Sequence, residues 1–190
     1  DFTHHAPHNK LVAIVLTKNE EAHLGACLDS LAWIDRRVVF DSFSTDRTCE
    51  IAIERGAEVV QHPFSDYASQ RNAAIDAVEA EWIFFVDADE RSTPELAEEI
   101  RTIVRGEWPL APTGWYVPRK NYLFGKLTRG AGYWPDYQMR LLKRGHAHYA
   151  TDTQTVHSRK RVRPREVMQR TAPCLSRVET HRLFAKSAHV

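Results

Sequence analysis

The first half of the chain alternates short apolar runs with segments of helical spacing, and no other feature constrains the fold as strongly. Four such runs are present: LVAIVLT (11–17), RVVFD (37–41), AEVVQH (57–62) and WIFFVDAD (82–89). Continuous apolar runs are typical of strands buried on both faces, as in a parallel sheet covered by helices. The sequence therefore predicts an α/β fold with a β-α-β-α-β-α-β first half, in an open, mostly parallel, Rossmann-like sheet flanked by helices.

Residue types that begin and end helices lie between these runs. The predicted boundaries are Asn19 for the first helix, Ser44 and Gly56 for the second, Ser65 and Val78 for the third, and Ser92 or Thr93 with Gly106 for the fourth. Arg71 stands inside the apolar stripe of the third helix, so we expect its side chain to face inward. A buried arginine requires an anion, which is either a substrate phosphate or a structural partner, Asp41 or Asp87.

The second half of the chain has a looser pattern. The segment GWYVPRKNYLFG (114–125) alternates enough to predict a strand or hairpin, and RLLKRGHAHYA (140–150) predicts a further strand.

The chain has 26 Lys+Arg and 25 Asp+Glu, but residues 141–190 carry 11 basic and only 3 acidic side chains. Its basic run SRKRVRPRE (158–166) is either a solvated segment or a patch for a membrane surface. Because no aromatic residues interleave with those charges, we expect no nucleic-acid partner.

Several classes of protein and site are excluded by composition. The longest purely apolar run, Leu11 to Leu16, is too short to span a bilayer. Cysteines 27, 49 and 174 lack CxxC spacing, which argues against a disulfide framework or structural zinc and favours a reducing compartment. We therefore expect a cytoplasmic protein, or one peripheral at the cytoplasmic face of a membrane.

Acidic side chains collect where the predicted strands end. They follow the first, second and fourth strands, and the set comprises Glu20, Asp41, Asp87, Asp89 and Glu90. Ligands of open α/β sheets bind beyond the carboxyl ends of strands, so these groups are expected at one edge. Two carboxylates two residues apart, Asp87 and Asp89, suit Mg²⁺ or Mn²⁺, which bridge protein carboxylates to substrate phosphates.

Five segments in this order carry a resemblance to a known family. They are LTKNEE (16–21), DSFSTDRT (41–48), SQRNAAID (69–76), WIFFVDADE (82–90) and GYWPDYQMRLLKRG (132–145). Together they resemble the family 2 glycosyltransferases of GT-A fold, in particular the bacterial lipopolysaccharide-core β-glucosyltransferases. The resemblance implies inverting transfer of glucose or a similar sugar from a UDP-sugar to a saccharide or lipid-linked acceptor, in cell-envelope polysaccharide synthesis.

The resemblance also implies roles for individual residues. The residues expected to bind the nucleotide are Thr17, Glu20, Asp41, Arg71 and Asp87. Asp89 and His157 are expected to bind the divalent cation, and Asp136 is expected to be the general base. The acceptor side is expected to include Trp134, Arg140 and Glu90. We accordingly divide the chain into an N-terminal extension (1–10), a glycosyltransferase domain (11–157) and a basic tail without assignment (158–190). Within the domain, residues 11–106 are the nucleotide-binding half and residues 107–157 the acceptor-side half.

Two departures from the family pattern keep a second function open. The usual glycine of the second strand's loop is Phe43, which removes a conformationally permissive position, and His157 is followed by Ser158 instead of glutamate. A nucleotide-sugar-binding or scaffolding protein without turnover is therefore the main alternative.

Two other classes fit less well. A dinucleotide-dependent oxidoreductase needs glycines that LTKNEE lacks, and an aspartyl-phosphate phosphatase places its Asp-x-Asp after the first strand.

Overall fold

The computed structural model describes residues 10–107, 112–123, 126–127, 136–149 and 178–182. Its strands are β1 (Leu11–Thr17), β2 (Arg36–Asp41), β3 (Glu58–Gln61), β4 (Trp82–Asp87), β5 (Glu90–Ser92), β6 (Gly114–Leu123), β7 (Lys126–Leu127), β8 (Asp136–Lys143) and β9 (Val178–Arg182). Its helices are α1 (Leu24–Ser30), α2 (Thr48–Glu54), α3 (Tyr67–Ala77) and α4 (Pro94–Arg105). Strands β1 to β4 alternate with α1 to α3, so the predicted β-α-β-α-β-α-β first half is confirmed.

One sheet runs through the molecule in the order β3-β2-β1-β4-β8-β6-β9-β5, with β7 paired to β6. Strands β1 to β4 are parallel, whereas β8 is antiparallel to both β4 and β6. The chain moves outward from β1 to β3 and then returns to β4 on the other side of β1. Such a reversal opens a crevice beyond the carboxyl ends of the two central strands, where α/β proteins bind their ligands.

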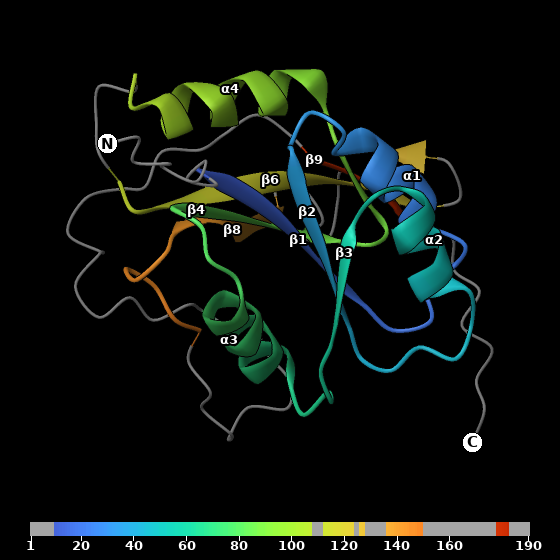
Figure 1. Ribbon diagram of the computed structural model, residues 1–190. Coiled ribbons are helices and arrows are strands. Elements are labelled where there is room, and N and C mark those ends of the chain that lie inside the picture. The colour runs from blue at the N-terminus through green and yellow to red at the C-terminus, as the bar shows by residue number, and fades with distance from the viewer. Residues whose placement is uncertain (1–9, 108–111, 124–125, 128–135, 150–177, 183–190) are drawn as a thin grey trace, which may run out of the picture.

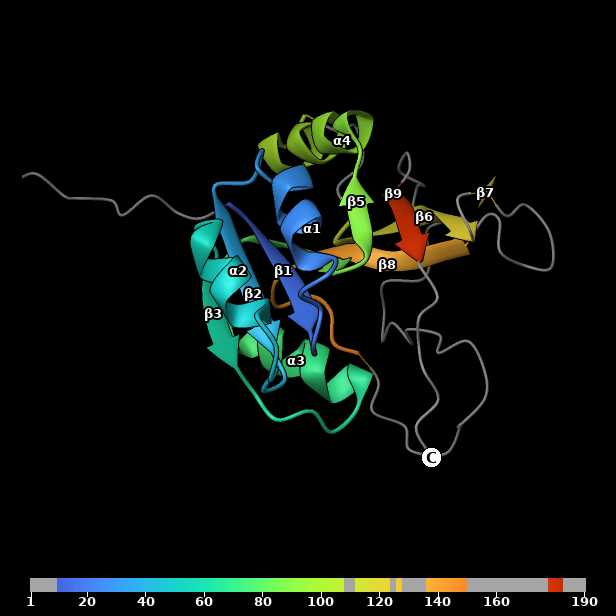
Figure 2. The ribbon, with the colours of Figure 1, turned by 90° about the vertical axis from the view of Figure 1, so that its right-hand side faces the viewer.

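Helices cover both faces of this sheet (Figure 1). Helices α1, α2 and α4 pack on one face, where Leu28 and Ile100 belong to the same core as Phe84 of β4. Helix α3 packs on the other face, where Ile75 lies in a second core with Phe85. Burying a side chain of this size contributes roughly 1.5–3 kcal/mol, so the continuous apolar run of β4 anchors both layers. In Figure 2, β6, β8 and β9 lie on the side of the molecule opposite β2 and β3.

Helix boundaries agree with the sequence only in part. Thr93 caps α4 as predicted, since its hydroxyl accepts from the Leu96 N–H, and Gly106 ends the helix with a φ of 79°. Asn19 and Ser44 are not caps: α1 begins at Leu24 and α2 at Thr48, and both predicted caps bond across loops instead. The longest described helix, α4, has 12 residues, and no described helix is both long and apolar enough to cross a membrane.

Strand β8 joins the second half of the domain to the parallel strands of the first half. It begins at Asp136, four residues before the predicted strand, and pairs with β4 through Trp82 opposite Lys143 and Phe84 opposite Leu141. Because the two strands are antiparallel, the start of β8 lies at the same sheet edge as the end of β4. Asp136 and Asp87 are therefore placed at one edge by backbone pairing, although they are far apart in sequence.

Strand β9 belongs to residues 158–190, the basic tail for which the sequence predicts no element. It pairs in parallel with β6 and antiparallel with β5, with Thr180 opposite both Asn121 and Glu90. It therefore joins two strands of the domain that do not otherwise touch in the sheet order. A short segment without apolar periodicity gives no sequence signal for such a distant pairing.

Candidate active site

Asp41 is the buried centre of the site beyond β2. Thr17, at the end of β1, donates its hydroxyl to Asp41 Oδ1 at 2.9 Å, and the backbone N–H of Ser44 donates to Oδ2 at 2.8 Å. Burial raises the pKa of this carboxyl, but hydrogen bonds from Ser44, Thr17 and Cys49 outweigh it and hold the pKa below its ordinary value. Thr17 and Asp41, both predicted to bind the nucleotide, are thus brought together as one charged, buried unit.

Two loops beyond β1 and β2 are bonded to each other, and we call residues 18–23 and 42–47 the paired loops. Lys18 Nζ donates to the carbonyls of Ser42 and Phe43 at 2.8 and 2.6 Å. Asn19 Oδ1 accepts from the Thr45 N–H at 2.8 Å. The predicted nucleotide ligand Glu20 joins the same arrangement, because its N–H donates to the Thr48 hydroxyl at 2.8 Å. These bonds fix the backbone at the mouth of the site without any regular secondary structure.

Two residues of the paired loops have left-handed backbones, Asn19 with φ 54° and Phe43 with φ 56°. Asparagine tolerates this conformation, whereas other residues with a β-carbon adopt it at a cost of roughly 1–2 kcal/mol. The Phe43 ring is also 51% exposed, so it gains little from packing. Phe43 is therefore a strained and poorly buried aromatic residue beside the carboxyl end of β2.

Beyond β4 lies a cluster of charges that we call the ion cluster, made of Asp87, Glu90, Arg71, Arg119 and Arg140. Arg140 donates to Asp87 Oδ1 and Oδ2 at 3.0 and 2.5 Å and to Glu90 Oε1 at 2.6 Å. Arg71 reaches Asp87 Oδ1 at 3.2 Å, and Arg119 lies 3.4 Å from Glu90 Oε1. With all five groups ionised, three guanidiniums exceed two carboxylates by one positive charge.

The two carboxyls of the ion cluster have opposite electrostatics. Burial raises the pKa of Asp87, but Arg140, Arg71 and Arg119 outweigh burial and hold that pKa well below its usual range. Glu90 is deeper, and burial together with the negative charge of Asp87 raises its pKa although Arg140 opposes the shift. Asp87 is the more accessible of the two carboxyls, since its side chain is 32% exposed and that of Glu90 is 1% exposed.

Arg71 is held between two aromatic rings. Its guanidinium lies 5.9 Å from the ring centre of Phe85 and 5.5 Å from that of Tyr149. Asn72 fixes Tyr149 by exchanging two hydrogen bonds of 2.8 Å with its backbone. The prediction that Arg71 faces inward is confirmed, and of the two structural partners considered the structure selects Asp87.

Other predicted residues are placed differently or are not described. Glu90 and Arg140 were expected on the acceptor side, but they are 0% and 2% exposed and bind each other, so neither presents its side chain to a ligand. Trp134 and His157 lie outside the described residues, and Asp136 is described by the position of its backbone in β8. Arg119 was not among the predicted site residues. It follows the buried Val117 by two positions in a strand, so both side chains lie on the same face of the sheet, and this spacing could have identified it.

A divalent cation fits this edge through one protein carboxylate. Within the described ranges, no group of three or more histidine, cysteine or acidic side chains is suited to hold a metal. Asp89 is partly exposed just beyond β4. Mg²⁺ is often held by one or two protein carboxylates and completed by substrate phosphates. The residues present therefore fit a cation held by Asp89 together with a diphosphate.

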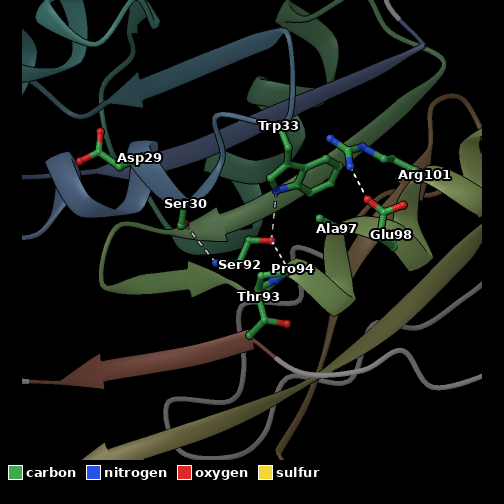
Figure 3. Close-up of a pocket in the computed structure, with 9 residues that line it drawn as sticks. All are labelled: Asp29, Ser30, Trp33, Ser92, Thr93, Pro94, Ala97, Glu98 and Arg101. Atoms are coloured by element: carbon green, nitrogen blue, oxygen red, sulfur yellow. Dashed lines mark hydrogen bonds and ion pairs between the residues drawn. The ribbon is translucent and has the colours of Figure 1, made fainter.

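A hollow of about 420 Å³ lies elsewhere, between α1, β5 and α4 (Figure 3). Its lining comprises Asp29, Ser30, Trp33, Ser92, Thr93, Pro94, Ala97, Glu98 and Arg101. Trp33 Nε1 donates to the Ser92 hydroxyl at 3.3 Å, and the Arg101 guanidinium lies 5.3 Å from the Trp33 ring centre. Because Trp33 precedes β2, this hollow lies toward the amino end of that strand, whereas the paired loops follow the carboxyl ends of β1 and β2.

The fold and the acids at its carboxyl edge define a class, the open α/β sheet of GT-A type. Residues 12–167 match the family model described as Glycosyl transferase family 2. The chain therefore belongs to glycosyl transferase family 2, as its five motifs indicated.

Relatives and solved structures agree with this membership. The lipopolysaccharide core biosynthesis glycosyltransferase LpsC of Rhizobium meliloti (strain 1021) is 33% identical over 80% of this chain and 57% of the relative. An uncharacterized glycosyltransferase of Rickettsia bellii (strain RML369-C) is 40% identical over 50% of this chain and 32% of the relative. The chain thus spans 57% of the length of the first relative and 32% of the second. The S. aureus TarS 1–349 structure aligns with a TM-score of 0.51 at 23% identity, over 67% of this chain and 40% of that one, which supports the fold.

Proposed function

We propose that this domain is a metal-dependent, inverting glycosyltransferase that moves glucose or a similar hexose from a UDP-sugar to a saccharide or lipid-linked acceptor of the cell envelope. The observation that carries the proposal is the meeting of three strand ends at one sheet edge: Asp41 ends β2, Asp87 ends β4 and Asp136 begins β8. The resemblance to LpsC supports the type of acceptor.

In this proposal, the paired loops and the ion cluster bind the donor nucleotide. Thr17, Glu20 and Asp41 hold the base and ribose, directly or through the loop that Asp41 fixes. Arg71 and the net positive charge of the ion cluster attract the diphosphate. A TarS fragment solved in complex with UDP-GlcNAc aligns at a TM-score of 0.50 and 24% identity, which supports a fold suited to such donors.

The cation is assigned to Asp89, with His157 as a further ligand. Bound there, a divalent cation would neutralise charge on the departing nucleoside diphosphate. Asp87 is proposed to orient the nucleotide side of the site, since Arg140 fixes both of its oxygens.

Asp136 is the proposed general base. It accepts the proton of the acceptor hydroxyl while that oxygen bonds to the anomeric carbon and the bond from that carbon to the diphosphate breaks. The position of Asp136 at the start of β8 suits this role, because an acceptor must approach the edge where the donor lies. Peripheral association of the basic segment 158–166 with a membrane surface would bring the domain to a lipid-linked acceptor.

Calorimetry with UDP, with and without Mn²⁺, tests the donor and cation assignments. We expect Mn²⁺ to tighten UDP binding to the wild-type chain, and Asp89→Ala to remove this effect while the thermal unfolding temperature is kept. Asp35→Ala is the control because that aspartate is exposed and precedes β2. Unchanged Mn²⁺ dependence in Asp89→Ala contradicts the cation assignment. UDP release from UDP-sugars, with and without a saccharide acceptor, separates a transferase from a protein that only binds nucleotide sugars.

A further inference from the structure

Phe43 combines a strained backbone with an exposed side chain, and packing within the fold does not offset the strain. Its backbone is left-handed, with φ 56°, at a position where glycine would carry no strain. Its ring is 51% exposed, so the strain is not offset by burial in a core. Strained residues persist where the surrounding structure imposes them, and they cluster at ligand sites.

The surrounding bonds impose this conformation. Asp41 Oδ2 accepts from the Ser44 N–H at 2.8 Å, which closes a tight turn around Ser42 and Phe43. Lys18 Nζ donates to the carbonyls of both turn residues, at 2.8 and 2.6 Å. The turn is therefore held from two sides, and the Phe43 ring is carried on a rigid support instead of a free loop.

The neighbours of the ring indicate what kind of ligand covers it. Phe43 lies two residues beyond Asp41 and is flanked in the chain by Ser42 and Ser44, so polar groups adjoin its ring along the chain. A planar nucleobase fits this ring, because every base has a π-face that can stack on one aromatic ring.

We propose that Phe43 is the stacking platform for the nucleobase of the donor and so determines nucleotide affinity. This inference rests on the proposed function, and it adds a base contact at the position where the family pattern has glycine. The strain and exposure of Phe43 in the free domain are then offset when the base covers the ring.

The test compares Phe43→Gly, Phe43→Leu and Phe43→Trp in the full chain by calorimetry with UDP and with inorganic pyrophosphate, both in the presence of Mn²⁺. We expect Phe43→Gly and Phe43→Leu to weaken UDP binding about tenfold, the size of one lost base stack, and Phe43→Trp to retain it. Pyrophosphate affinity should stay unchanged, because it has no base. Phe43→Gly should unfold at the wild-type temperature or above, since glycine relieves the strain. Ile53→Ala, which alters an exposed apolar residue on α2, is the control.

Three outcomes would overturn the inference. Equal UDP affinity in wild type and Phe43→Gly shows that the ring does not contact the base. A lower unfolding temperature for Phe43→Gly shows that the ring is a packing residue. Weaker binding of Phe43→Gly to anionic lipid vesicles with unchanged UDP affinity assigns the ring to a membrane surface instead. Failure of the proposed function is recognised separately, because wild-type chain would then bind neither UDP nor pyrophosphate.

Discussion

Arg140 binds both oxygens of the Asp87 carboxylate: Nη1 donates to Oδ1 at 3.0 Å and Nη2 donates to Oδ2 at 2.5 Å. The same guanidinium also reaches Glu90 Oε1 at 2.6 Å. Since Asp87 ends β4 and Arg140 lies on β8, this one side chain joins the first half of the domain, residues 11–106, to the second half. The bidentate geometry also fixes the orientation of the Asp87 carboxylate, as a point charge would not.

Replacing Arg140 by leucine should strongly destabilise the domain. Asp87 and Glu90 would lose their shared partner, and removing one member of a buried ion pair costs about 3–5 kcal/mol. Urea unfolding followed by circular dichroism measures this loss. Arg101→Leu is the matched control, because its pair with Glu98 is exposed and should contribute less than about 1 kcal/mol. An Arg140→Leu protein as stable as wild type would show that the cluster does not hold the halves together.

Replacing Arg71 by leucine should affect binding more than folding. Asp87 keeps Arg140 in this variant, and leucine can still pack against the rings of Phe85 and Tyr149. The excess positive charge of the ion cluster is lost, so UDP affinity should fall about tenfold or more. Calorimetry and urea unfolding on one preparation compare the two effects. Normal UDP binding by the folded fraction of an unstable variant would instead make Arg71 a structural ion-pair residue only.

Removal of β9 should weaken the fold. A chain ending at residue 177 leaves β5 and β6 without the strand that pairs with both, whereas a chain ending at residue 182 keeps it. We expect the shorter chain to unfold at a lower temperature than the longer one, measured by differential scanning calorimetry. Equal unfolding temperatures would show that β9 does not stabilise the domain.

Local signals in the sequence are sufficient where the contacts themselves are local. Helix α4 is predictable with its cap Thr93 and its terminating Gly106, because both act within one turn of the helix. The prediction of Asn19 and Ser44 as caps is wrong because their side chains bond across the paired loops, to partners 25 or 26 residues away.

The site is predictable to the level of its strand ends, but not of its ion pairs. Apolar runs show where strands end, so the sequence alone places Asp41 and Asp87 at one edge of the sheet. Helical spacing turns Arg71 inward, but it does not say which strand end lies opposite, and both Asp41 and Asp87 fit as partners. The burial of Glu90 depends on Arg119 and Arg140 of distant strands, which no local pattern reports.

Asp41 should make the domain sensitive to acid. Its folded pKa lies below the ordinary value of 3.8, so the unfolded chain binds its proton first as the pH falls. The stability contributed by Asp41 is complete above about pH 4 and is lost as the pH falls through the folded pKa. Between about pH 4 and pH 2, the unfolding temperature of Asp41→Asn should therefore fall less than that of the wild type. Asp35→Asn is the exposed control. Identical acid slopes in wild type and Asp41→Asn would exclude this linkage.

Asp136→Asn tests the base directly. The substitution keeps the shape of the side chain and removes its capacity to accept a proton, so turnover should fall about 100-fold or more. UDP and Mn²⁺ affinities should stay near wild type, because those ligands are assigned to the paired loops, the ion cluster and Asp89. The measurement is UDP release during transfer to a verified saccharide acceptor, with calorimetry on the same variant. Glu90 is a poor substitute for this base, since it is 0% exposed and bound to Arg140. Full turnover by Asp136→Asn, or a defect confined to UDP affinity, would therefore move the base to a residue other than Asp136 and Glu90.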